Sequence, residues 1–139
     1  MEYVLADTGV WYAMFDSRDQ YYAEAIEKIE YLEIFQIVLP WPTVYETLRT
    51  RFVRNRLALQ EFSNFLKRPN IIYLDDTDYR KDAFELSLES SLRRGRPLSM
   101  VDCLIRLILS DVNTKIDYLA TFNPADFIDV CHKRRIEIF

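Results

Sequence analysis

The sequence contains very little glycine, with only Gly9 and Gly95 among its 139 residues. A Gly-x-x-x-x-Gly-Lys loop for nucleoside triphosphates and a Gly-x-Gly-x-x-Gly turn for dinucleotides both need closely spaced glycines. The sequence therefore excludes both kinds of phosphate site. It also lacks repeats and Gly/Ser-rich linkers, which predicts regular elements joined by short loops.

Cysteine and histidine are equally scarce, because Cys103, Cys131 and His132 are the only ones in the chain. A zinc site needs about four such ligands and a disulfide framework needs several cysteine pairs, so we expect neither. We predict that both cysteines are reduced thiols. Any metal must then be bound by oxygen atoms, which favours a hard cation such as Mg²⁺ or Mn²⁺.

Long hydrophobic runs are also missing. The most apolar stretch, 100–109, contains Asp102 and Arg106 and is shorter than the roughly 20 residues that cross a bilayer. The first residues include Glu2 and Asp7 and lack the basic and apolar regions of a secretion signal. We therefore expect a cytoplasmic protein with no membrane segment.

Length and composition predict a single domain that spans residues 1–139. Half of the residues are hydrophobic and 14% are aromatic, which is outside the composition of disordered chains. The formal net charge of −4 argues against a protein that coats nucleic acid through bulk charge. Any binding to nucleic acid must come from local basic patches.

Short apolar runs alternate with longer amphipathic segments along the chain. Strands are predicted at 3–6, 36–39, 71–74 and 118–120, with a weaker candidate at 136–139. Helices are predicted at 20–35, 43–54, 56–67, 77–94 and 99–112. This alternation predicts an α/β fold, a three-layer α/β/α sandwich with a mainly parallel central sheet. In such sheets ligands bind beyond the carboxyl ends of the strands, where Asp7 and Thr121 lie.

Several motifs carry candidate functional residues, and each also has a structural explanation. Asp7 precedes the opening of a helix and is a good N-cap for its first turn. Ser99 and Asp102 resemble a capping box at the start of the 99–112 helix. Because that helix is apolar almost all round, the Asp102 carboxylate needs a cap, a metal or an ionic partner. Arg106, one turn further on, is the candidate partner.

Glu46 and the segment 121–127 are equally ambiguous when each is taken alone. Glu46 lies outside the apolar stripe of its helix, as a solvated acid does. Asn123 suits the cap of a short turn, Pro124 its first position and Asp126 its positive end. Taken singly, these motifs favour structural roles.

The order and spacing of the motifs resemble the PIN domain family over residues 7–127, nearly the whole chain. The resemblance is carried by a strand that ends in Asp7-Thr8, a Glu in the helix after the second strand, a Ser-x-x-Asp helix start and the segment Thr121-x-Asn123-Pro124-x-Asp126-Phe127. It implies a PIN-like, Mg²⁺- or Mn²⁺-dependent ribonuclease in which Asp7, Glu46 and Asp102 hold the metal. On first principles, three crowded carboxylates raise one another's pKa unless a divalent cation neutralises them.

The family also implies partners. Its members include the toxins of toxin–antitoxin pairs, so the resemblance implies RNA as the substrate, a small antitoxin protein as inhibitor and a homodimer. Many members have a fourth acid where this chain has Asn123. Either Asp126 compensates or the Asn123 amide positions a water, and both are candidate catalytic residues. The alternative is a catalytically impaired PIN-like module that binds RNA or protein.

Substrate must be held by positive charge around the acidic centre. Three basic groups are available, at 49–56, 93–96 and 133–135, and the first two flank presumed metal ligands. Each is also explained as a solvated face, which we favour for the last group. Trp11, Tyr12 and Tyr45 are candidates to stack an unpaired base. The residues singled out for contact with the substrate are Thr8, Ser99, Thr121, Arg49 and Arg96.

Overall fold

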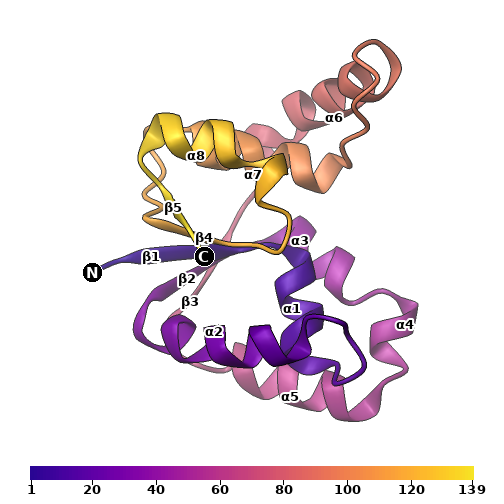
Figure 1. Cartoon of the computed structure of the whole chain (residues 1–139), viewed down its shortest axis with the longest axis vertical. Helices are drawn as coiled ribbons and strands as arrows, with labels where there is room; N and C mark the ends of the chain where they lie inside the picture. Colours follow the sequence, from indigo (N-terminus) through magenta and orange to yellow (C-terminus); the bar gives the residue numbers. More distant parts are fainter.

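The computed structural model describes residues 1–139 and has a five-stranded, all-parallel sheet between two layers of helices (Figure 1). The strand order is β3-β2-β1-β4-β5. The strands are β1 (Tyr3–Ala6), β2 (Gln36–Pro40), β3 (Ile71–Leu74), β4 (Tyr118–Ala120) and β5 (Glu137–Ile138). The predicted α/β/α sandwich is confirmed, and all five predicted strands are present.

The helices divide between the two faces of the sheet. On one side lie α1 (Thr8–Phe15), α2 (Tyr22–Ile34), α3 (Trp41–Thr47), α4 (Thr50–Val53) and α5 (Arg56–Leu66). On the other lie α6 (Thr77–Leu92), α7 (Met100–Ser110) and α8 (Ile128–Arg134), with the short 3-10 helix η1 (Pro124–Asp126) before α8. None of these helices combines the length and the hydrophobicity that crossing a bilayer requires.

Each face of the sheet has its own hydrophobic core, because successive side chains of a strand point to opposite faces. In β1, Val4 and Ala6 belong to the core under α1, α2 and α5, whereas Leu5 belongs to the core under α6, α7 and α8. Trp11 is completely buried in the first core. The suggestion that Trp11 stacks a base is therefore wrong, because its ring has no access to solvent.

The central position of β1 determines where a site can form. Leu5 pairs with Val38 of β2 on one side, and Ala6 pairs with Ala120 of β4 on the other. The chain connects β1 to neighbours on both sides, so the carboxyl end of β1 is a topological switch point. Asp7 is the first residue beyond that end.

The helix predicted over 43–54 is interrupted. α3 ends at Thr47, Arg49 is extended with ψ 167°, and α4 begins at Thr50. The Thr47 hydroxyl donates to the Thr43 carbonyl at 2.7 Å, a local bond that competes with continued helix. Leu48, which the apolar pattern placed in the buried stripe, is 39% exposed. The break brings Arg49 over the ring of Tyr12.

Two further details differ from the expectations. β3 is an edge strand on which Ile72 and Tyr73 are exposed, so it is not buried on both faces. The pattern of the sequence did not predict α8, because this helix has seven residues and only Cys131 is buried.

Cys103 and Cys131 are buried free thiols, as expected.

Candidate functional site

Asp7 combines its structural role with a place at the switch point. Its Oδ1 accepts a hydrogen bond of 2.7 Å from the Thr8 amide, so it is the N-cap of α1. Its Oδ2 accepts one of 3.1 Å from Thr121 Oγ1, just beyond β4. The Asp7 amide donates to the Ala120 carbonyl at 3.0 Å. The side chain is thus fixed from two strands, and the residue is only 6% exposed.

The environment of Asp7 disfavours its negative charge. Burial is the largest cause, and the charge of Asp102 is the second; together they raise the pKa of Asp7 from 3.8 to about 6. The charge of Glu46 adds a smaller increase, whereas the hydrogen bonds from Thr8 and Thr121 lower the pKa. The three carboxylates that the sequence singled out therefore interact in the fold, from the end of β1, from α3 and from α7.

Asp102 lies in the first turn of α7 and is half-buried. Ser99 is the N-cap, and its hydroxyl accepts from the Asp102 amide at 3.0 Å. Burial raises the pKa of Asp102, hydrogen bonding with Ser99 opposes this, and the charge of Asp126 adds to it. The predicted start of this helix at Ser99 and Asp102 is confirmed.

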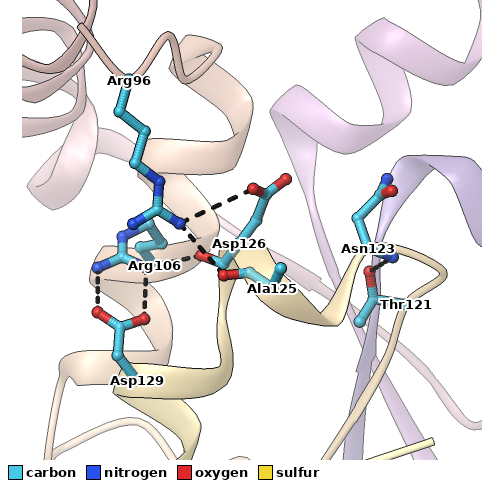
Figure 2. A network of polar contacts seen from close by, with 7 residues as sticks. All are labelled: Arg96, Arg106, Thr121, Asn123, Ala125, Asp126 and Asp129. Atoms are coloured by element: carbon cyan, nitrogen blue, oxygen red, sulfur yellow. Dashed lines mark hydrogen bonds and ion pairs between the residues drawn. The ribbon is translucent and has the colours of Figure 1, made fainter.

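The expected ion pair between Arg106 and Asp102 does not form. The Arg106 guanidinium instead bonds both carboxylate oxygens of Asp129, at 2.8 and 2.7 Å, and donates to the Asp126 carbonyl at 2.6 Å (Figure 2). One turn of helix separates Arg106 from Asp102, but its long side chain reaches α8 instead. Asp102 therefore has no ionic partner, and neither do Asp7 and Glu46.

Glu46 is half-buried near the end of α3. Its backbone carbonyl accepts a hydrogen bond from the Tyr12 hydroxyl on α1, which ties the two helices together. The Arg49 guanidinium lies 4.6 Å from the centre of the Tyr12 ring, a cation–π contact. Arg49 thus follows Glu46 by three residues, and its guanidinium contacts an aromatic ring and forms no ion pair.

The segment after β4 supplies the other predicted residues. Asn123 is exposed, and its backbone N–H donates to Thr121 Oγ1 at 3.0 Å. No hydrogen bond joins the Asn123 side chain to the carboxylates. The Arg96 guanidinium lies 3.9 Å from Asp126 Oδ1 and donates to the Ala125 carbonyl at 3.2 Å (Figure 2). Arg96 is therefore positioned by η1 beside an acid that acts on Asp102.

Two buried hydroxyls in this region have no hydrogen-bond partner, those of Thr8 and Thr43. Thr8 follows Asp7 directly and is 2% exposed, so its hydroxyl does not face solvent. Thr43 is completely buried one turn before Glu46 on α3. The sequence did not single out Thr43, and the only available signal was its i,i+3 spacing from Glu46.

The chemistry of these side chains fits a hard divalent cation, because all the donors are oxygen atoms and the cluster is acidic. The fit is incomplete in one respect: no three acidic, histidine or cysteine side chains lie close enough together to form a ready-made metal site. Asp102 and Glu46 are nevertheless close enough for their charges to raise the pKa of Asp7. Asp7 is fixed by its hydrogen bonds, so closure of a site depends on Glu46 and Asp102.

The basic groups separate into two kinds. Arg94 pairs with Glu89 at 3.2 Å, and Arg134 donates to the Leu109 carbonyl at the end of α7 at 2.8 Å. These contacts explain both residues as structure. The arginines at 51, 54 and 56 form no ion pair, which leaves their charge available.

No protein-family model matches the sequence, and no curated protein matches it either.

Proposed function

We propose that this chain is a PIN-type, Mg²⁺- or Mn²⁺-dependent endoribonuclease that hydrolyses phosphodiester bonds of RNA. The observation that carries the proposal is the buried Asp7 carboxylate, whose pKa is raised to about 6 by burial and by the charge of Asp102. Both causes disfavour the ionised acid, so keeping Asp7 charged without a cation costs the fold free energy. A cation held by Asp7, Glu46 and Asp102 relieves the repulsion.

The residues around the cluster have distinct roles in this proposal. A bound divalent cation supplies Lewis-acid chemistry to the phosphate and to the attacking water. Thr121 and the Thr8 amide hold the Asp7 carboxylate in one orientation, and Ser99 fixes the first turn that carries Asp102. Asn123 is exposed and Asp126 half-buried, so in this proposal their side-chain oxygens are available to position a water.

Positive side chains near the cluster bind the substrate. Arg96 lies beside Asp126, and Arg49 lies over the Tyr12 ring, three residues after Glu46 in the chain. A guanidinium presents a fork of donors that matches a phosphate group. Tyr45, which is 74% exposed and adjacent to Glu46, is available to stack a base.

A second candidate function is a PIN-like module that binds RNA or protein without cutting. Asn123 favours it, because an amide replaces the fourth acid that the resemblance implies. In this alternative the arginines bind a partner and the carboxylates hold no reactive metal.

We further propose a cytoplasmic homodimer that is inhibited by a small antitoxin protein. Self-association is supported by the large exposed apolar side chains of α6, where Phe84 is 54%, Leu88 46% and Leu92 79% exposed. The antitoxin follows from the resemblance, and co-purification from the native host tests it. If only this chain is recovered and the product of the neighbouring reading frame neither binds nor inhibits it, there is no antitoxin.

The test of the nuclease is cleavage of a mixed RNA pool by purified protein with Mn²⁺ or Mg²⁺. We expect cleavage by the wild type, loss of nearly all of it in Asp7→Asn, and full retention in Asp82→Asn. Asp82 is an exposed acid of α6 and makes no ion pair, so this variant controls for the loss of one charge. If wild type and Asp7→Asn are equally inert and neither metal raises the melting temperature, the proposal is wrong.

A further inference from the structure

A polar hollow is lined by the segment after α1 and by the junction of α4 and α5. Figure 1 shows these two segments side by side. Its volume is about 810 Å³, and no hydrophobic residue lines it. The lining consists of four arginines and three uncharged polar residues: Arg18, Arg51, Arg54, Arg56, Ser17, Thr50 and Asn55. No acid is among them, although the whole chain carries a net charge of −4.

Two of the four arginines have no partner in the folded chain. Arg18 bonds both oxygens of Asp16, at 3.1 and 3.3 Å, and the charge of Arg51 also acts on Asp16. Arg54 and Arg56 are exposed, form no ion pair and donate no side-chain hydrogen bond. Asp16 therefore explains Arg18 and partly offsets Arg51, whereas the charges of Arg54 and Arg56 are free. Such a concentration of one sign of charge attracts an anion.

The N-terminus of α5 adds to the positive potential of the hollow. Asn55 is its N-cap and accepts from the Ala58 amide at 3.2 Å, and Arg56 is the first residue of this 11-residue helix. The free amides and the dipole at a helix N-terminus favour negative charge. Helix and arginines therefore act together at one wall of the hollow.

The lining identifies the chemistry of the ligand. With no apolar or aromatic side chain, the hollow offers nothing on which a base or a hydrocarbon packs. Guanidinium groups bind phosphate oxygens in pairs, and four of them spread over an open hollow suit several phosphates in a row. A nucleic acid backbone presents such a series of phosphates at regular spacing.

A chain of contacts leads from this hollow to the backbone of Glu46. Arg51 also lines a smaller hollow of about 80 Å³, together with Arg49, Tyr12 and Phe52. Tyr12 in turn donates to the carbonyl of Glu46. Asp16 and Asp19 line the smaller hollow as well, so the positive charge is strongest in the larger one.

We infer that the arginine hollow binds the sugar-phosphate backbone of an RNA segment beyond the bond that is cut. This inference rests on the proposed ribonuclease function, because it takes the substrate of that reaction as the ligand. The arginines bind phosphates, so binding is independent of base sequence. The substrate is then an RNA that extends several nucleotides past the acidic cluster, and very short RNAs bind weakly.

Binding of an end-labelled RNA of about 12 nucleotides, within the span of known single-strand grooves, tests this by fluorescence anisotropy. The measurement is made in EDTA, so the RNA stays whole. We expect Arg54→Gln/Arg56→Gln to bind roughly tenfold more weakly than the wild type. The slope of log K against log salt should shrink by about 1.4, which is about 0.7 for each phosphate of the single strand that the variant no longer neutralises.

The matched control is Lys67→Gln/Lys81→Gln, which removes the same charge from the far end of α5 and from α6. This control should bind as the wild type does. Asn55→Asp is a second variant that keeps an N-cap and places a carboxylate in the hollow, so weaker binding without loss of thermal stability is expected. It remains informative if the double arginine variant fails to fold.

Three results overturn the inference: unchanged affinity in both Arg54→Gln/Arg56→Gln and Asn55→Asp, equally weakened binding in the lysine control, or binding of polyglutamate as tight as that of RNA. The last result assigns the hollow to an acidic protein. The outcome for the nuclease is separate. Cleavage with no dependence on the hollow leaves the proposed function standing and removes this inference, whereas hollow-dependent RNA binding without any cleavage supports the inference and removes the nuclease.

Discussion

Thr121 Oγ1 donates a hydrogen bond of 3.1 Å to Asp7 Oδ2, between residues 114 positions apart in the sequence. The bond joins the carboxyl ends of β4 and β1, which are hydrogen-bonded neighbours in the sheet. The same hydroxyl oxygen accepts a hydrogen bond of 3.0 Å from the backbone N–H of Asn123. One threonine thus connects the most buried acid of the cluster to the turn that carries Asn123 and Asp126.

Replacement of Thr121 should show how much its hydrogen bond to the buried Asp7 carboxylate contributes to the free energy of unfolding. We expect Thr121→Val to lower the free energy of unfolding by about 2 kcal/mol at about pH 8, because a buried carboxylate loses a donor. The loss should shrink near pH 4, where a protonated Asp7 needs that donor less. Urea unfolding at both pH values measures it. Thr47→Val is the matched control, since its buried hydroxyl bonds a backbone carbonyl at 2.7 Å and its effect should not change with pH.

Removal of the Asp7 charge should stabilise the metal-free protein. The folded-state pKa of about 6 lies above the ordinary value of 3.8, so the folded state binds the proton more tightly than the unfolded state does. The resulting penalty is fully present above about pH 6, falls as the pH drops through that value and vanishes below about pH 4. Its ceiling is about 3 kcal/mol. We expect Asp7→Asn to gain about 1–2 kcal/mol at about pH 8.

The pH dependence of this difference is the decisive part of the experiment. Other carboxylates titrate in the same range, so the wild type and Asp7→Asn are compared at each pH in EDTA, and only their difference is interpreted. A gain that is the same at about pH 4 and pH 8 contradicts the assigned pKa. Added Mn²⁺ should reverse the order, by stabilising the wild type and leaving Asp7→Asn unchanged.

The fold was predictable because the apolar runs are distinct. Each predicted strand matches an observed one to within two residues at either end, since buried parallel strands are short and continuously apolar. The break of the predicted 43–54 helix was not predictable, because the apolar pattern continues through it and the segment contains neither glycine nor proline. The exposed face of β3 was missed because the pattern does not tell an edge strand from a central one.

The sequence singled out Asp7, Glu46 and Asp102 but could not predict their geometry. In the fold the charges of Asp102 and Glu46 both act on Asp7, and a metal site formed by the three residues stays a prediction. Spacing on the α7 helix favoured Arg106 as the partner of Asp102, but the tertiary position of Asp129 on α8 decides that ion pair. Thr43 was missed, because its burial depends on how separate helices pack. The basic group at 49–56 was singled out as a candidate to hold substrate, but the hollow that it forms with Arg18 depends on the fold.

Trp11 and Tyr45 are two of the candidates for stacking a base, and their substitution should have opposite effects on stability and on RNA binding. Trp11 is completely buried and packs edge-on against Phe62 and Phe65, with ring centres 5.6 Å apart in each case. We expect Trp11→Ala to lose about 3–5 kcal/mol of stability. Tyr45→Ala should change stability by less than about 0.5 kcal/mol. Chemical denaturation measures both, and anisotropy with labelled RNA should show weaker binding for Tyr45→Ala alone.

Trp11→Phe provides a milder probe of the same position. The Trp11 Nε1 is buried without a hydrogen-bond partner, so the wild type already carries the cost of an unsatisfied donor. Loss of that donor offsets part of the lost packing, and we expect a net cost below about 1.5 kcal/mol. A cost as large as that of Trp11→Ala indicates that the indole nitrogen does have a partner in solution.

Arg106 should matter more for stability than its main partner does. Its side chain is 17% exposed and donates to the carboxylate of Asp129 and to the Asp126 carbonyl. Arg106→Met leaves that partly buried carbonyl without its donor, for which we expect a loss of about 2–3 kcal/mol. Asp129→Asn should cost under about 1 kcal/mol, because Asp129 is 57% exposed and water screens the pair.

The ion pair also predicts a pH effect of opposite sign to that of Asp7. The hydrogen bond from Arg106 is the first cause that lowers the pKa of Asp129 to about 2, below its ordinary value of 3.8. Its contribution to stability is present above about pH 4 and is lost as the pH falls through about 2. The difference in the free energy of unfolding between the wild type and Asp129→Asn should therefore disappear in strong acid.

Arg106 also anchors η1 through its bond to the Asp126 carbonyl. Arg106→Met should therefore lower the rate of RNA cleavage more than Asp129→Asn does. Equal cleavage rates contradict a role of η1 in placing Asp126.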